Sequence, residues 1–276
     1  MDDDGQYIEI ENARVFLTAR GAGQPVLLLH GLSFDQRVWR HQVQILSPHF
    51  RVLCPDLLGF GRSSPITGPF SHTQALERVL TQLGHSRVHI VGHSLGGRIA
   101  GEFVQTYPDR VASLTLAAAD LGGVPLPTVG ANIRKVFELG KVDIAAAKRA
   151  FIELPVFDVL RQKPGPFAFF EQMVADYSGW LFANASRGLE LRPETPTCQL
   201  LETFAVPTLV LLGEFEHPDF FSIGEEVIRR VPGAVQRVIP KASHVPNLEE
   251  PERFSAELLD FLKSADQRER PARGTA

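Results

Sequence analysis

The sequence predicts an α/β fold in which a mostly parallel sheet carries helices on both faces and a helical insertion interrupts it. Three observations predict this. Short apolar runs alternate with helical segments, which is the pattern of parallel strands buried on both faces. The alternation lapses over residues 122–204, where helical periodicity continues without a convincing strand. It resumes after the tripeptide AVP and continues to about residue 264.

The expected elements follow in a regular order along the chain. Two short β-rich runs open it and precede a glycine turn. The expected strands are 7–10, 14–18, 26–29, 52–54, 88–91, 114–118, 208–212 and 235–239. The expected helices of the α/β part are 38–46, 73–83, 95–107, 223–231 and 251–263.

The insertion is predicted to form a helical cap. Asp143 is expected to N-cap one helix, and Pro166 lies near the start of another. The second helix is expected to align residues at spacings of three and four, namely Phe167, Phe170, Val174, Tyr177 and Leu181. The resulting division is a first core part (1–121), the cap (122–204), a second core part (205–264) and a polar tail expected to be disordered (265–276).

Composition excludes several classes of partner. The net charge of −4 provides no electrostatic footprint for nucleic acid or an anionic membrane. The acidic N-terminus lacks the features of a signal peptide, and no apolar run reaches the roughly 18–20 residues of a membrane span. Cys54 and Cys198 are too few for a disulfide framework or a metal knuckle. We expect a cytoplasmic protein with no metal and no cofactor, whose oligomeric state is open.

The stretch VGHSLGG, residues 91–97, carries the strongest chemical signal. It fits the pattern G-x-S-x-G between a predicted strand and a predicted helix. Small flanking residues let the two elements approach closely, and the turn exposes the Ser94 hydroxyl above the sheet. Ser94 is therefore the expected nucleophile, rather than an ordinary helix-capping serine.

A serine nucleophile needs a base, and the base needs an orienting carboxylate. His244 follows the last predicted strand, in a loop that can reach back over the sheet. In hydrolases of this order the acid lies between the serine and the histidine, which favours Glu216 after the strand 208–212. Asp120, after the strand 114–118, is the alternative acid, and Glu214 and Asp219 share the loop of Glu216.

An oxyanion that forms on the substrate needs two N–H donors. The amide of Leu95 lies at the expected helix N-terminus directly after Ser94. The dipeptide HG ends the strand 26–29, and Gly31 allows the backbone to approach the substrate closely. Leu32 is therefore the expected second donor.

These motifs together resemble the α/β-hydrolase fold superfamily over about residues 15–262. The matching stretches are PVLLLHG, PDLLGFGRSS, VGHSLGG, PTLVLLGEFE and SHVPNLEEPERF. The resemblance implies an eight-stranded sheet, a helical cap over the pocket, and a structural role for the turn that holds Asp56, Gly59, Gly61 and Ser63. One departure is Glu216, where the family usually carries aspartate. A serine nucleophile argues against the branches in which aspartate attacks, the haloalkane dehalogenases and epoxide hydrolases.

The substrate is expected to be a small lipophilic ester or lactone, because the insertion is rich in aromatic residues and poor in clustered basic ones. The residues expected to contact it are Phe34, His93, Phe170, Trp180 and Val245. Carbon–carbon bond hydrolases and cofactor-free perhydrolases use the same triad, and a slow-turnover ligand receptor or an acyltransferase is a further alternative. The sequence does not separate these.

Overall fold

Eight strands form one mixed sheet in the computed structural model, which describes residues 5–269. Their order is β1-β2-β4-β3-β5-β6-β7-β8. β2 pairs antiparallel with β1 and β4, and the remaining neighbours are parallel. The predicted eight-stranded, mostly parallel sheet is confirmed. Its strands are β1 (Gln6–Ile10), β2 (Ala13–Arg20), β3 (Pro25–Leu29), β4 (Arg51–Pro55), β5 (Val88–His93), β6 (Val111–Ala117), β7 (Thr208–Gly213) and β8 (Val235–Ile239).

The central strands β3, β5, β6 and β7 are buried along their whole length. This explains why they read as continuous apolar runs, since helices cover both faces of a parallel sheet. The outermost strands, β1 and β8, are mostly exposed. The carboxyl ends of the central strands therefore form a rigid edge on which loops can carry side chains.

Within residues 5–269, six helices belong to the α/β part. α1 packs against α11, α2 packs against α3, and α9 lies against β7. The helices are α1 (Arg40–Leu46), α2 (His72–Gln82), α3 (Leu95–Thr106), α9 (Pro218–Arg230), α10 (Pro246–Glu249) and α11 (Pro251–Glu269). Short 3-10 turns are η1 (Gln36–Trp39), which precedes α1, and η2 (Pro108–Arg110). Among the residues described, no helix is both long and apolar enough to cross a membrane.

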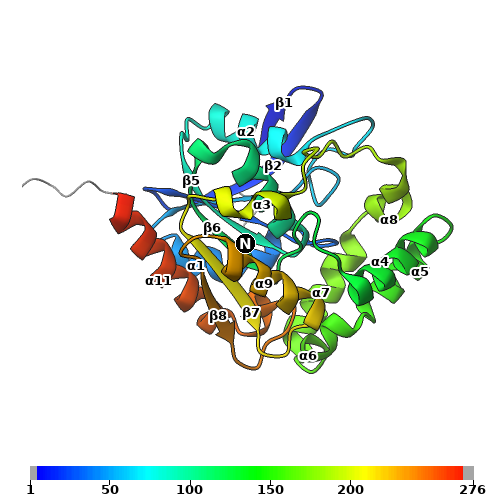
Figure 1. Cartoon of the computed structure of the whole chain (residues 1–276). Helices are drawn as coiled ribbons and strands as arrows, with labels where there is room; N and C mark the ends of the chain where they lie inside the picture. The colour runs from blue at the N-terminus through cyan, green and yellow to red at the C-terminus, as the bar shows by residue number, and fades with distance from the viewer. Residues whose placement is uncertain (1–4, 270–276) are drawn as a thin grey trace, which may run out of the picture.

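Of the helices between β6 and β7, α4 to α8 gather on one side of the molecule, away from α1 and α11 (Figure 1), whereas η5 contacts α3 and α9. We call the chain from α4 to η4 the cap. Asp143 caps α5 as predicted, because its side chain accepts from the N–H of Ala146 at 2.9 Å. The elements between β6 and β7 are α4 (Pro127–Gly140), α5 (Ile144–Ile152), η3 (Pro155–Phe157), α6 (Asp158–Arg161), α7 (Pro164–Asp176), α8 (Trp180–Asn184), η4 (Ala185–Arg187) and η5 (Thr197–Thr203).

Three helix ends differ clearly from the sequence prediction. α9 begins at Pro218, five residues before its predicted start. α7 stops at Asp176, since Tyr177 is extended and Gly179 is left-handed with φ of 78°. Leu181 therefore lies in α8 and does not continue the α7 stripe. α11 runs to Glu269, so the first part of the predicted tail is helical, and residues 270–276 lie outside the described part of the chain.

Candidate active site

Ser94 occupies a sharp turn between β5 and α3. Its backbone φ of 51° and ψ of −116° is a conformation that side-chain-bearing residues rarely adopt. The close approach of strand and helix explains the neighbouring glycines. A Cβ on Gly92 would lie 2.2 Å from the carbonyl oxygen of Gly96, and one on Gly96 would lie 2.4 Å from that of Leu29. The glycines permit the turn, and the turn raises the Ser94 hydroxyl above the sheet edge.

His244 lies in the loop between β8 and α10 and reaches Ser94. Its Nε2 is 3.2 Å from the Ser94 Oγ, and its Nδ1 is 3.2 Å from Oε2 of Glu216. The other Glu216 oxygen accepts from the N–H of His217 at 2.8 Å. With the Nδ1 proton directed to the carboxylate, Nε2 is free to accept the serine proton.

The structure brings Glu216, and not Asp120, to the histidine. Asp120 follows β6, and its backbone N–H donates to the carbonyl oxygen of Ser94 at 3.1 Å. Its carboxylate lies 3.9 Å from Nε of Arg98. Burial raises the pKa of Asp120, and the positive charges of Arg98 and Arg192 oppose that shift. Asp120 thus stands beside the serine but faces a different partner.

The two predicted N–H donors are the backbone amides of Leu32 and Leu95. Leu95 is the first residue of α3, so its N–H has no acceptor one turn earlier within the helix. Leu32 follows β3 and precedes Ser33, whose φ of 64° marks a tight turn. Both leucines line the same cavity as Ser94 and His244. This is the arrangement in which two N–H groups can stabilise a developing oxyanion.

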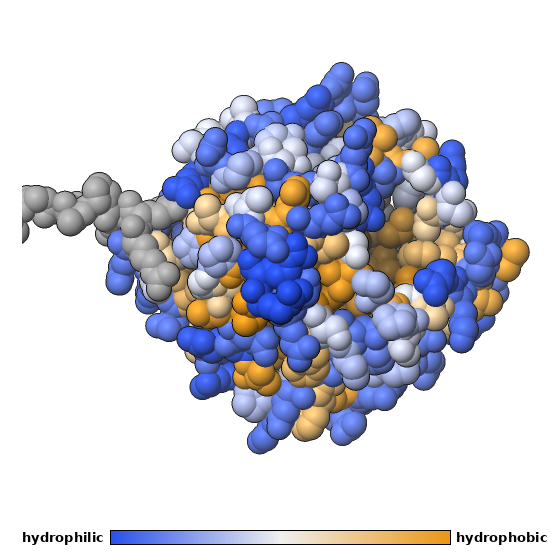
Figure 2. Space-filling model, viewed as in Figure 1, coloured by the Kyte–Doolittle hydropathy of each residue, from blue (hydrophilic) through white to orange (hydrophobic). Residues whose placement is uncertain are grey.

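The cavity in front of Ser94 measures about 490 Å³ and lies where the cap meets the α/β part. Figure 2 shows a hollow lined with apolar side chains on the side of the molecule where the cap lies. One wall is apolar and one is polar. The apolar wall includes Phe70, Leu126, Val129, Ile133, Phe137, Phe151, Leu154, Val156, Phe157, Trp180, Leu181 and Phe220. The polar wall includes Arg98, Asp120, Asn184, Glu190 and Arg192, and Arg134 lies on α4.

Of the residues expected to contact substrate, Phe34 and Trp180 line this cavity. His93, Phe170 and Val245 are fully buried behind it and are not part of its lining. His93 instead donates from Nε2 to the carbonyl oxygen of His244 at 2.7 Å, which supports the loop of the histidine. Burial lowers the pKa of His93 to about 3, so its ring is neutral.

Sequence reasoning named Asp120 but missed the other charged residues of the polar wall. Arg98 and Glu102 are four residues apart on α3, a spacing at which opposite charges pair, so that pair was open to prediction. Glu190 also pairs with Arg98 at 2.8 Å, but it comes from the segment that leads from the cap back to β7. No local pattern signals this second contact.

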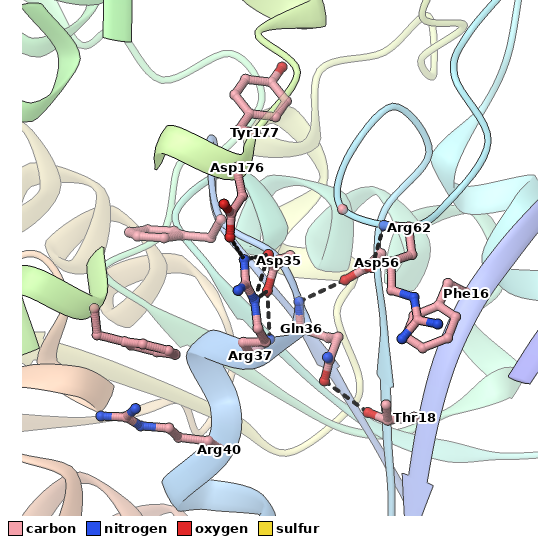
Figure 3. Close-up of a pocket in the computed structure, with 13 residues that line it drawn as sticks. Phe16, Thr18, Asp35, Gln36, Arg37, Arg40, Asp56, Arg62, Asp176 and Tyr177 are labelled. Atoms are coloured by element: carbon pink, nitrogen blue, oxygen red, sulfur yellow. Dashed lines mark hydrogen bonds and ion pairs between the residues drawn. The ribbon is translucent and has the colours of Figure 1, made fainter. Parts of the chain in front are cut away.

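Phe34 also lines a second cavity, of about 450 Å³. Figure 3 shows this second cavity. Its charges largely pair with one another. Arg37 bridges Asp35 and Asp176 at 2.7 and 2.8 Å, which ties η1 to the end of α7 in the cap. Asp56 accepts from two backbone N–H groups, and burial raises its pKa to about 7. Within residues 5–269, no three His, Cys, Asp or Glu side chains are grouped as metal ligands.

The chain matches the model of the alpha/beta hydrolase family over residues 26–257. The chain belongs to the alpha/beta hydrolase family. It is accordingly a hydrolase, and its predicted superfamily is confirmed. Family membership alone does not assign the bond that is cleaved.

Several members of this family are similar over nearly the whole chain. A 2-hydroxy-6-oxononadienedioate/2-hydroxy-6-oxononatrienedioate hydrolase of Paraburkholderia phymatum is 28% identical, over 90% of this chain and 91% of the relative. A pimeloyl-[acyl-carrier protein] methyl ester esterase of Vibrio vulnificus is 26% identical, over 88% of this chain and 95% of the relative. The structure of a thermophilic esterase from Thermogutta terrifontis superposes with a TM-score of 0.82 at 29% identity, covering 94% of this chain and 99% of the esterase.

Proposed function

We propose that this hydrolase cleaves small lipophilic carboxylic esters or lactones through an acyl-enzyme on Ser94. The observation that carries the proposal is the continuous chain of contacts from Glu216 through His244 to the Ser94 hydroxyl, at the floor of a largely apolar cavity. A hydroxyl with a base and an oriented carboxylate is the arrangement of nucleophilic acyl transfer.

The first half of the reaction forms the acyl-enzyme. The Ser94 Oγ attacks the ester carbonyl carbon while Nε2 of His244 takes the hydroxyl proton. The carbonyl oxygen becomes an oxyanion, and the amides of Leu32 and Leu95 stabilise it. The carbon–oxygen bond to the alcohol then breaks, and His244 returns the proton to the leaving alcohol. Glu216 stabilises the imidazolium that exists between these two proton transfers.

The second half repeats the sequence with water. His244 removes a proton from a water molecule, which attacks the acyl carbonyl carbon. The carbon–oxygen bond to Ser94 breaks, the serine regains its proton from His244, and the carboxylic acid leaves. Both halves use the same two amides to stabilise the oxyanion.

The lipophilic substrate class is argued from the apolar wall. Aromatic and aliphatic side chains of the cap and the α/β part surround the space in front of Ser94, and burying an apolar group there is favourable by ~25 cal/mol per Å². The similarity to an esterase at 29% identity and to a methyl ester esterase at 26% supports ester cleavage.

A second candidate is hydrolysis of a carbon–carbon bond in a vinylogous diketone, with the same three residues. It is favoured by the 28% identity to the dienedioate hydrolase named above. The two candidates differ in the leaving atom, which is oxygen in one and carbon in the other. Only turnover of defined substrates separates them.

The test compares p-nitrophenyl butyrate with a 2-hydroxy-6-oxo-dienoate, each followed by absorbance. We expect turnover of the ester that falls at least a thousandfold in Ser94→Ala. Ser222→Ala, which changes an exposed serine on α9, is the matched control and keeps the activity of the wild type. Turnover of the dienoate in preference to the ester would replace the ester proposal with its alternative.

A further inference from the structure

The polar wall of the cavity is built around one buried arginine, Arg98, which is only 4% exposed. Its Nη1 donates to both carboxylate oxygens of Glu102, at 2.9 and 3.0 Å. Its Nη2 donates to both oxygens of Glu190, at 2.8 and 2.9 Å. Its Nε faces the Asp120 carboxylate at 3.9 Å. Three carboxylates therefore surround the guanidinium, and two of them occupy the Nη1 and Nη2 donors with which an arginine binds a ligand anion.

Of the two carboxylates that pair most closely with Arg98, only Glu190 lines the cavity. Glu102 lies one turn further along α3 and is 3% exposed. Glu190 comes from the segment that returns from the cap, and backbone bonds hold this segment. The N–H of Phe70 donates to the carbonyl oxygen of Leu189 at 3.0 Å, and that of Leu191 donates to Phe70 at 2.6 Å. Glu190 thus meets Arg98 at the cavity surface, where a substrate group would otherwise approach.

The charges of this wall do not sum to a positive site. Arg98 and Arg192 face three carboxylates, and Nε of Arg192 is itself bound to Glu102 at 2.8 Å. With the three carboxylates ionised, the group carries one net negative charge.

Arg134 on α4 is the other cation that lines the cavity, and it is exposed to solvent. Water and salt screen the attraction of such a charge.

We propose that Glu190 makes the polar wall reject anionic substrates, so that the hydrolase selects esters without a negative charge. The proposal rests on the ester hydrolysis proposed above and adds the charge class of its substrate. A substrate carboxylate at this wall would have to displace Glu190 from Arg98 and then lie beside Glu102 and Asp120. Like charges repel strongly in a desolvated site, which disfavours such a substrate. A hydroxyl, ester or amide group meets no such repulsion.

The test uses matched pairs of esters that differ in one charge. p-Nitrophenyl pentanoate and mono-p-nitrophenyl glutarate probe the acyl side, and 4-acetoxybenzamide and 4-acetoxybenzoate probe the alcohol side. The measured quantity is the ratio of kcat/KM for the neutral ester to that for the anionic one. We expect a ratio of at least a hundred for the wild type in one pair or in both.

Replacing Glu190 with a neutral residue removes the negative charge that pairs with Nη2 of Arg98 at the cavity surface. In Glu190→Gln we expect the ratio to fall at least tenfold, through a gain in kcat/KM for the anionic ester. Asp120→Asn removes a carboxylate that lies farther from Arg98, at 3.9 Å, and should lower the ratio by a smaller factor. Glu226→Gln is the matched control. Glu226 pairs with Arg230 on α9 and does not line the cavity, so this variant should keep the wild-type ratio. Circular dichroism and melting temperature show whether each variant is folded.

Two results would overturn the proposal. One is a wild-type ratio near one in both pairs, and the other is a ratio that Glu190→Gln and Asp120→Asn, both folded, leave unchanged. A preference for the anionic ester that disappears in Arg134→Gln would place substrate recognition on the cap arginine and would also overturn it. Absence of Ser94-dependent turnover of every ester is a different outcome, because it refutes the proposed function itself.

Discussion

Replacing Glu216 with glutamine removes the charge beside His244 and keeps the size of the side chain. The carboxylate and the imidazole are 3.2 Å apart, and both residues are 5% exposed. At an effective dielectric constant of about 20, opposite charges at this distance attract by ~5 kcal/mol. This attraction acts on the imidazolium of the transition state, so losing it corresponds to a fall in kcat of roughly 10³- to 10⁴-fold.

The assay is kcat for p-nitrophenyl butyrate, with melting temperature as the check on folding. Glu216→Asp should also lose activity, because a side chain shorter by one bond of about 1.5 Å moves the carboxylate beyond hydrogen-bond distance. Glu214→Gln alters the same loop at an exposed carboxylate that accepts from the N–H of Lys241, and it should stay within threefold of the wild type. The reasoning is refuted if folded Glu216→Gln keeps more than a tenth of kcat while Asp120→Asn loses a hundredfold.

Three further outcomes are expected. His93→Leu leaves the carbonyl of His244 without its donor, at a cost of ~1–3 kcal/mol, so kcat should fall at least tenfold with little change in KM, and His93→Gln should restore part of it. Burial raises the pKa of Glu249 from 4.5 to about 7, so the stability that its neutral form provides is complete below pH 4.5 and is lost as the pH rises to 7. Urea unfolding at pH 5 and pH 8 gives the free energy of unfolding of Glu249→Gln and of the wild type. Relative to the wild type, the variant should be more stable at pH 8 than at pH 5 by ~1–3 kcal/mol. Gly92→Ala places a methyl group 2.2 Å from the Gly96 carbonyl oxygen, so we expect a loss of soluble protein or a melting temperature several degrees lower.

Each of these three predictions has a result that would contradict it. A His93→Gln variant as inactive as His93→Leu would contradict the role of the hydrogen bond to His244. Equal pH dependence of wild type and Glu249→Gln would show that the buried carboxyl does not titrate across this range. Normal yield, melting temperature and kcat for Gly92→Ala would mean that the turn at Ser94 tolerates a Cβ at position 92.

The sheet and the turn at Ser94 could be predicted from the sequence because their signals are local. Apolar runs identify strands buried on both faces, and G-x-S-x-G between a strand and a helix identifies the turn at Ser94. His244 follows from the order of the strands, since carboxyl ends of parallel strands share one edge. The choice between Glu216 and Asp120 was open, because both follow a strand on that edge and only three-dimensional distance separates them.

Side-chain direction is the part that the sequence did not determine. His93 and Val245 are each next to a candidate catalytic residue in the chain, yet both are fully buried and neither lines the cavity. Their neighbours Ser94 and His244 lie in a turn and a loop, where consecutive side chains follow no fixed period, so adjacency in sequence is weak evidence for adjacency in a site. The contact of Glu190 with Arg98 joins residues 92 positions apart and has no sequence signal.

The central claim is that Ser94 carries the acyl group during turnover. Its most direct test is to mix the enzyme with excess p-nitrophenyl butyrate, quench within the first turnover and map the acyl group by peptide mass spectrometry. We expect a burst of p-nitrophenol close to one equivalent per chain, where deacylation is the slower half, and a butyryl group on the peptide that contains Ser94. A burst of p-nitrophenol with no acylated Ser94 peptide, or an acyl group on another residue, would contradict the account.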